Sequence, residues 1–267
     1  IIIANSRKSH TVTFGLDDIM EYRVRHPHVP CLHRINDTDK HRDTNHIDDL
    51  LSQLNEVAQF TIFISDWVRD YHARRWFDTT KPHAVIMNGA SSRFFHPFGN
   101  VELTAGDTMR IITHHWSTNW MKGFAVYENV DRMIADGEIP GVELWIVGRW
   151  PEEIRWRAAK LFPPMSGKKL SGVIRQCHVY LTATRWEASG MHWIEAAQCG
   201  LPIVYHLDGG GVVEMVGRYG VGFRDDVRSA ICEVRQRYME LRNILLQDAP
   251  SGGRMCVEYE RIVRRLI

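Results

Sequence analysis

Apolar and polar positions along the chain predict a repeated alternation of strands and helices. Short apolar runs bounded by turn residues predict buried strands, whereas apolar positions spaced three and four apart predict amphipathic helices. The predicted strands are residues 1–4, 30–35, 61–64, 84–87, 110–113, 142–147, 178–181 and 202–205. The predicted helices are residues 14–24, 47–58, 67–76, 124–134, 168–177, 191–199 and 257–266, a mostly helical stretch 225–246, and a helix that begins at Pro151. Strands that alternate with helices predict an α/β fold with doubly wound parallel sheets.

An aperiodic stretch between these blocks predicts the boundary between two domains. Residues 96–107 contain proline and glycine and show no apolar period, which is typical of a linker. We therefore predict a first domain at residues 1–100 and a second at 101–254. Residues 255–267 form a C-terminal helix that is a candidate to cross back to the first domain.

The stretch from residue 182 to residue 222 carries the strongest candidate chemistry. Glu187 and Glu195 are separated by seven residues, and Gly190 marks a tight turn before the predicted helix 191–199. A second glycine loop, 209–211, follows the next strand. A strand, a glycine turn and a helix N-terminus favour anion binding, because free backbone N–H groups point out of the first helical turn. Carboxylates beside such a site suit hydroxyl groups, so the pattern indicates a ligand with both, such as a sugar nucleotide. The alternative interpretation is an ordinary α/β unit.

These motifs resemble the donor-site signature of retaining glycosyltransferases of family 4. Glu187 and Glu195 match the E-x7-E motif, and the following G-L-P-I-V and D-G-G-G-x-x-E segments are also similar. Lys122-Gly123 resembles the K-G pair of the donor domain, and Asn88-Gly89 resembles the crossover into the linker. The resemblance implies the GT-B fold, in which two Rossmann-like domains face a cleft. It also implies that the first domain lacks its first strands.

The resemblance implies an enzyme that moves a sugar from a nucleotide-sugar donor to a hydroxyl acceptor with retention of configuration. The acceptor class, whether glycan, lipid or small molecule, stays open, and neither a metal nor another cofactor is expected. In this family pattern Glu195 holds the ribose hydroxyls and Glu187 binds the transferred sugar. Lys122 stabilises the leaving diphosphate together with backbone N–H groups. The residues that would supply those N–H groups are Gly190, Met191 and His192. Glu187 and Lys122 are the predicted catalytic residues.

Two positions depart from the family pattern. Ser117 stands where the family carries a phosphate-binding arginine, so His115 and Arg149 are the candidates for a second cation. Asn36 stands where many members carry a histidine, and an amide can orient a hydroxyl but cannot act as a base. The predicted acceptor-side residues are Arg34, Asn36 and Lys40.

The composition limits the partner and the compartment. A net charge of +1 gives no support for a general nucleic-acid surface. The five cysteines form no C-x-x-C motif, which favours free thiols in a reducing compartment and a cytoplasmic location. No apolar run is long enough to predict a membrane span. The oligomeric state stays open.

Two weaker features have an ordinary explanation beside the functional one. Arg69, Arg74 and Arg75 on one predicted helix are a candidate for peripheral membrane contact, and a solvated helix face is the alternative. The polar run 38–45 is expected to be a solvated loop. His41, Asp43 and His46 are close in sequence there but form no recognised ligand pattern, so we assign no metal and they stay a metal candidate.

Three other functions compete with glycosyl transfer. A GT-B enzyme of another activity, such as a sugar-nucleotide epimerase or a phosphorylase, would share the fold. A phosphorylase would be expected to carry a cofactor-binding lysine or a second phosphate site, which the sequence does not offer. A non-catalytic subunit that binds sugar nucleotides or glycans would keep both glutamates without turnover.

Overall fold

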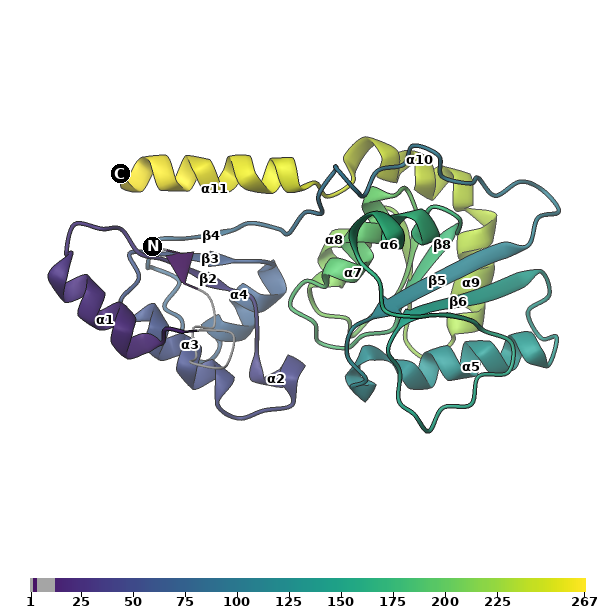
Figure 1. Cartoon of the computed structure of the whole chain (residues 1–267), viewed down its shortest axis with the longest axis horizontal. Helices are drawn as coiled ribbons and strands as arrows, with labels where there is room; N and C mark the ends of the chain where they lie inside the picture. The colour runs from purple at the N-terminus through teal and green to yellow at the C-terminus, as the bar shows by residue number, and fades with distance from the viewer. Residues whose placement is uncertain (1, 4–12) are drawn as a thin grey trace. The chain divides into compact units, whose positions relative to one another are not determined.

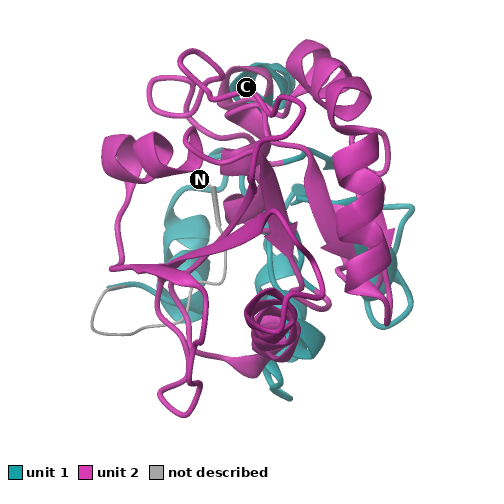
Figure 2. Ribbon diagram, turned by 90° about the vertical axis from the view of Figure 1, so that its right-hand side faces the viewer, with its two compact units in different colours: residues 1–87, 187–189, 255–267 teal, residues 88–186, 190–254 magenta. Residues whose placement is uncertain are grey.

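The computed structural model describes residues 2–3 and 13–267. Its backbone divides into two compact units (Figure 2). Unit 1 comprises residues 1–87, 187–189 and 255–267, and unit 2 comprises residues 88–186 and 190–254. Residues 88–100, which the sequence analysis assigned to the first domain, therefore group with unit 2. Of the strand predicted at residues 1–4, the pair Ile2–Ile3 is described, and the rest lies outside the described residues.

Unit 1 is built on a parallel sheet with the strand order β1-β2-β3-β4. The strands are β1 (Ile2–Ile3), β2 (Leu32–Ile35), β3 (Phe60–Phe63) and β4 (His83–Val85). The helices are α1 (Leu16–Arg25), α2 (Asp39–Arg42), α3 (Ile47–Asn55), α4 (Asp66–Ala73) and α11 (Gly252–Leu266). Helix α11 lies on one side of these strands, and α1 and α3 lie on the other (Figure 1).

The core of unit 1 follows the alternation of side chains along its strands. Leu32 and Ile62 face α11 and pack with Ile262 of that helix. Ile35 and Phe63 point to the opposite face, where they pack with side chains of α3 and α4. Ser65 caps α4, because its hydroxyl accepts a hydrogen bond from the N–H of Val68.

Unit 2 contains a parallel sheet with the order β10-β9-β8-β5-β6-β7. Its strands are β5 (Met109–His115), β6 (Val142–Gly148), β7 (Lys160–Phe162), β8 (Val179–Thr182), β9 (Ile203–His206) and β10 (Gly220–Phe223). Its helices are α5 (Phe124–Ala135), α6 (Gly167–Ile174), α7 (Met191–Gln198), α8 (Gly211–Val216), α9 (Val227–Gln236) and α10 (Tyr238–Asp248). From β5 the chain winds outward through β6 and β7, and then returns to the other side of β5 with β8. Ligands of open α/β sheets bind at such a reversal, outside the carboxyl ends of the strands.

Neighbouring residues of one strand serve the two cores of unit 2. Ile111 of β5 packs with α5 and α9, whereas Ile112 packs with α7 on the opposite face. Both faces of the sheet are therefore covered by helices, which is why its strands read as continuous apolar runs.

Three sequence predictions were wrong. The helix predicted from Pro151 does not form, because the buried Asp131 carboxylate accepts the backbone N–H groups of residues 157–159 and holds the segment in turns. The strands β7 and β10 were missed, since both are short and the second contains two glycines. The polar run 38–45 contains the short helix α2, where a loop was expected.

Candidate functional site

The candidate donor site lies in unit 2, at the carboxyl ends of β5 and β8. Lys122 follows β5 in the short 3-10 turn Trp120–Lys122, and Asn119 caps that turn by accepting the N–H of Met121 at 2.8 Å. Helix α7 follows β8. The topology therefore brings the lysine and the E-x7-E segment to the reversal of strand order.

Gly123 allows the Lys122 turn to sit against the loop after β8. Its φ is +88°, and a Cβ added there would lie 2.4 Å from the Cβ and the carbonyl oxygen of Ala183. The Thr184 hydroxyl also reaches the Lys122 carbonyl, at 3.5 Å. Glycine in the K-G pair thus permits both the left-handed backbone and the close approach of this turn to Ala183.

The N-terminus of α7 directs the backbone N–H groups of its first turn toward the carboxyl end of the sheet. Gly190 is the N-cap residue and makes no side-chain cap hydrogen bond, because it has no side chain. Met191 is partly exposed, whereas His192 is buried with its Nε2 3.0 Å from the Thr182 hydroxyl. His192 can therefore contribute its backbone N–H to a ligand, while its imidazole is engaged with β8.

Glu195 is held by a histidine that the sequence analysis did not select. Its Oε2 lies 3.0 Å from Nε2 of His114, which is the penultimate residue of β5. The His114 side chain is 5% exposed and that of Glu195 is 21% exposed, so the carboxylate keeps access to solvent. The Tyr180 hydroxyl accepts the backbone N–H of His114 at 3.1 Å and fixes the strand end. The sequence feature that could have pointed to His114 is the pair of adjacent histidines at the end of an apolar strand.

His115 does not supply the second cation that the sequence analysis considered. Its Nε2 lies 2.9 Å from the Thr113 hydroxyl and 3.1 Å from the Tyr127 hydroxyl, within the core. Burial, reinforced by His192 and Lys122, holds the pKa of His115 well below its ordinary value. A neutral imidazole cannot attract phosphate as a charge. Arg149 is exposed just after β6, where its N–H donates to the His115 carbonyl at 2.9 Å.

Glu187 belongs to a segment that groups with unit 1. Residues 187–189 connect two parts of unit 2 in sequence, yet Ala188 is buried in the core of unit 1 with Ile35 and Phe63. The Ser65 hydroxyl donates to the Ala188 carbonyl at 2.6 Å. The role of Glu187 at the transferred sugar stays a prediction.

The three acceptor-side candidates lie on different parts of unit 1. Arg34 donates to the Tyr259 hydroxyl of α11 at 3.0 Å, so it serves the helix-covered face of the sheet. Asn36 follows β2 and has a buried Oδ1 without a hydrogen-bond partner. Lys40 is exposed on α2. Their roles toward an acceptor stay predictions.

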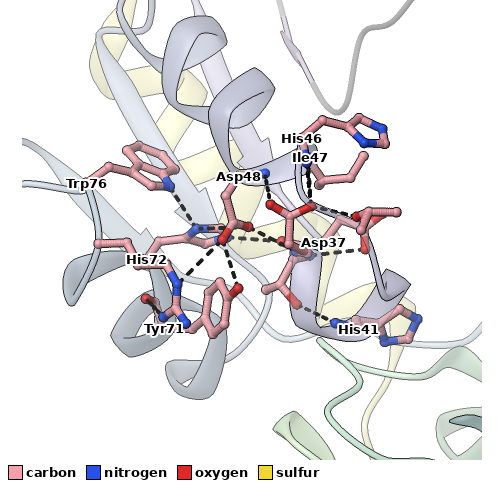
Figure 3. A network of polar contacts seen from close by, with 12 residues as sticks. Asp37, His41, His46, Ile47, Asp48, Tyr71, His72 and Trp76 are labelled. Atoms are coloured by element: carbon pink, nitrogen blue, oxygen red, sulfur yellow. Dashed lines mark hydrogen bonds and ion pairs between the residues drawn. The ribbon is translucent and has the colours of Figure 1, made fainter.

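A polar network fixes the segment that follows β2 (Figure 3). Trp76 donates its indole N–H to Nδ1 of the buried His72 at 3.0 Å. The other ring nitrogen of His72 therefore carries the proton and donates to the Asp37 carbonyl, also at 3.0 Å. The Tyr71 hydroxyl donates to Asp48 at 2.8 Å, and burial together with this carboxylate raises the pKa of Tyr71 to about 12.

Helices α2 and α3 cap each other within this network. Asp39 accepts the backbone N–H groups of His46 and Ile47 at 2.9 Å, and Asp48 accepts the N–H of Asp39 at 3.0 Å. The segment is therefore rigid at the carboxyl end of β2, where open α/β sheets bind ligands.

The described residues offer neither a metal site nor a membrane span. Residues 2–3 and 13–267 contain no group of three His, Cys, Asp or Glu side chains placed to hold a metal ion, His41, Asp43 and His46 included. Within the same ranges, no helix combines the length and the apolar character that a membrane span requires. Cys31, Cys177 and Cys199 are buried thiols, and Cys232 and Cys256 are exposed thiols.

Comparison with known proteins finds a family model that matches part of the chain. Residues 117–238 match the family model described as glycosyl transferases group 1. No curated protein sequence matches the chain. The matched segment contains Lys122, the helix α7 and the second glycine loop, so it covers the candidate donor site.

Solved structures show the same fold at low sequence identity. Sucrose-phosphate synthase from Thermosynechococcus elongatus is 15% identical, with a TM-score of 0.68 over 93% of this chain and 71% of that one. Anabaena HepE in complex with UDP and glucose is 14% identical, with a TM-score of 0.70 over 93% and 74%. The pneumococcal O-GlcNAc transferase GtfA in complex with UDP and GlcNAc is 16% identical, with a TM-score of 0.69 over 99% and 56%. The predicted α/β fold with parallel sheets, as in GT-B glycosyltransferases, is confirmed, and together with the family match it supports a glycosyltransferase.

Proposed function

We propose that this protein is a retaining glycosyltransferase that moves a sugar from a nucleotide-sugar donor to a hydroxyl acceptor. One observation carries the proposal: Lys122, the N-terminus of α7 and the His114–Glu195 pair all lie at the reversal of strand order in unit 2. A cation and the backbone N–H groups of a helix N-terminus suit a diphosphate, and a carboxylate suits ribose hydroxyls. Two of the structural neighbours are complexes with UDP, which supports a nucleotide-sugar donor.

The leaving group is the part of the reaction that unit 2 stabilises. As the bond between the anomeric carbon and the diphosphate oxygen breaks, negative charge grows on the diphosphate. Lys122 and the N–H groups of residues 190–192 would stabilise that charge, and such fixed donors at a developing charge are the largest single contribution in many enzymes. Removing one donor of this kind typically lowers kcat by about 100- to 1,000-fold.

Glu195 would bind the ribose, and Glu187 would orient the transferred sugar. His114 donates its Nε2–H to one oxygen of Glu195, which leaves the other oxygen for ribose hydroxyls. In a same-face substitution the acceptor oxygen bonds to the anomeric carbon while its proton passes to the departing phosphate oxygen. A reaction of this kind needs no protein nucleophile and no metal.

Thermal shift with UDP-, GDP- and ADP-sugars tests donor binding. A ligand that binds the folded state alone raises the melting temperature, by an amount set by the ratio of its concentration to Kd. We expect stabilisation by one nucleotide class and its loss in Glu195→Gln. Glu240→Gln, an exposed helix carboxylate paired with Arg237, is the matched control.

Turnover then distinguishes an enzyme from a binding subunit. With the identified donor, the anomeric configuration of the product or of released sugar is read by NMR. Retained configuration is expected. Inverted product would refute the retaining mechanism, and donor binding without transfer to any hydroxyl acceptor would favour the non-catalytic subunit.

A further inference from the structure

The loop after β8 contains an arginine that the sequence analysis did not assign. A nucleoside diphosphate carries at least two negative charges near neutral pH, one on each phosphate, and gains a third above the second pKa of its terminal phosphate, about 6. Of the candidates for a second cation, His115 is neutral and buried, and Ser117 is uncharged. The site as described so far therefore offers Lys122 alone as a charge at its centre.

Arg185 is tied directly to the Lys122 turn. Its backbone N–H donates to the Met121 carbonyl at 3.0 Å, one residue before Lys122. The preceding hydroxyl, on Thr184, reaches the Lys122 carbonyl itself. The Arg185 side chain is exposed and extends toward the end of β9, where its Nη2 lies 3.4 Å from Nε2 of His206.

The contact between Arg185 and His206 brings two donors together. The N–H of Asp208 donates to Nδ1 of His206 at 2.9 Å, so the neutral ring carries its proton on Nε2. Burial, followed by the charge of Arg185, lowers the pKa of His206 and favours this neutral form. A guanidinium N–H cannot donate to an N–H, so both groups are left with donors directed at the same place. An anionic oxygen between them would satisfy both.

No nearby carboxylate neutralises the guanidinium. Asp208 is the acidic residue beside His206, and its Oδ1 is already paired with Arg224 at 2.8 Å. Among residues 2–3 and 13–267, no carboxylate forms an ion pair with Arg185. The backbone is held in place on the other side as well, because the Trp186 N–H donates to the Asp208 carbonyl at 2.8 Å with Trp186 at a φ of +53°. Keeping a non-glycine residue in the left-handed region costs free energy, which indicates that the surroundings fix this loop.

We propose that Arg185 is the second phosphate-binding cation of the donor site, and that its guanidinium and the Nε2–H of His206 together hold an oxygen of the diphosphate. The proposal rests on the proposed function for the identity of the ligand. Lys122 and Arg185 would contact the diphosphate from the loops after β5 and β8. Arg149, the candidate from the sequence, follows β6 on the other side of β5.

Isothermal titration calorimetry of the whole chain tests this assignment with inorganic pyrophosphate, with UDP, GDP and ADP, and with the matching nucleosides. The variants are Arg185→Gln, Arg185→Lys, the rival Arg149→Gln, and Arg218→Gln as a control whose native residue pairs with Asp248 at the surface. Loss of a charge-assisted hydrogen bond should weaken pyrophosphate and nucleoside diphosphate binding by about 10- to 100-fold in Arg185→Gln. Arg185→Lys should lose less, and nucleoside binding and Arg218→Gln should be unchanged. Circular dichroism of each variant verifies that it is folded.

The outcomes separate this proposal from the proposed function. Equal binding by Arg185→Gln and the native protein, or a loss confined to Arg149→Gln, would overturn the assignment. The assignment would also be overturned if the native protein bound neither pyrophosphate nor any of the nucleoside diphosphates. If pyrophosphate binds through Arg185 while no nucleoside diphosphate binds, the anion site stands and the glycosyltransferase function fails.

Discussion

Replacing Gly123 with alanine should destabilise unit 2 more than the same change at any open glycine. At a φ of +88° an L-residue pays the left-handed penalty of about 1–2 kcal/mol. The new Cβ would also lie 2.4 Å from Ala183, and overpacking of this kind adds about 1–3 kcal/mol. We therefore expect Gly123→Ala to lower the free energy of unfolding by about 2–5 kcal/mol.

Gly106→Ala is the matched control for this experiment. Gly106 has the same φ of +88°, but nothing lies within 4 Å of an added Cβ. Its substitution should cost the backbone penalty of about 1–2 kcal/mol alone. Urea unfolding followed by tryptophan fluorescence gives both free energies. If the two variants lose the same stability, the close approach to Ala183 does not limit position 123, and the K-G pair does not require glycine for that contact.

Three further predictions concern other parts of the chain. His114→Leu should weaken nucleoside diphosphate binding by about 10-fold, because Glu195 loses its hydrogen bond to the histidine. Calorimetry should show no such loss for 2′,3′-dideoxy nucleotides, which lack the ribose hydroxyls. An equal loss for both ligands would contradict the ribose role of Glu195. Asp131→Ala should cost about 1.5–3 kcal/mol in thermal unfolding, because the N–H groups of residues 157–159 lose the buried carboxylate that accepts them. Asp136→Ala, at the surface, should cost clearly less, and similar costs would refute this role. Burial and, secondarily, His72 lower the pKa of His33 to about 3. The unfolded chain then binds the extra proton, so His33 should lower the stability as pH drops from about 6.5 toward about 3, by about 1.4 kcal/mol per pH unit beside the contributions of the other buried histidines. His33→Gln should reduce the total slope by that amount, and an unchanged slope would exclude the contribution of His33.

Local sequence patterns predicted most of the architecture. Strands such as β5, β6, β8 and β9 are continuous apolar runs because both faces of the sheet are covered, and this signal lies within a few residues. Helix α7 and its N-cap Gly190 were predicted for the same reason. The helix expected at Pro151 shows the limit: proline suits a first helical turn, but the acceptor that holds the segment in turns is Asp131, on α5.

In the candidate site, too, local patterns were predictable from the sequence and contacts between distant segments were not. The sequence by itself determined the glutamate spacing, the K-G pair and the glycine before α7, because each is a local pattern with a backbone reason. Tertiary structure alone decided that Glu195 is held by His114, 81 positions away in the chain. It also set the surroundings of two basic residues: His115 is buried, which lowers its pKa well below the ordinary value, whereas the Arg185 side chain is exposed and contacts His206. Burial and hydrogen-bond partners set protonation, and both arise from contacts between segments that are distant in sequence.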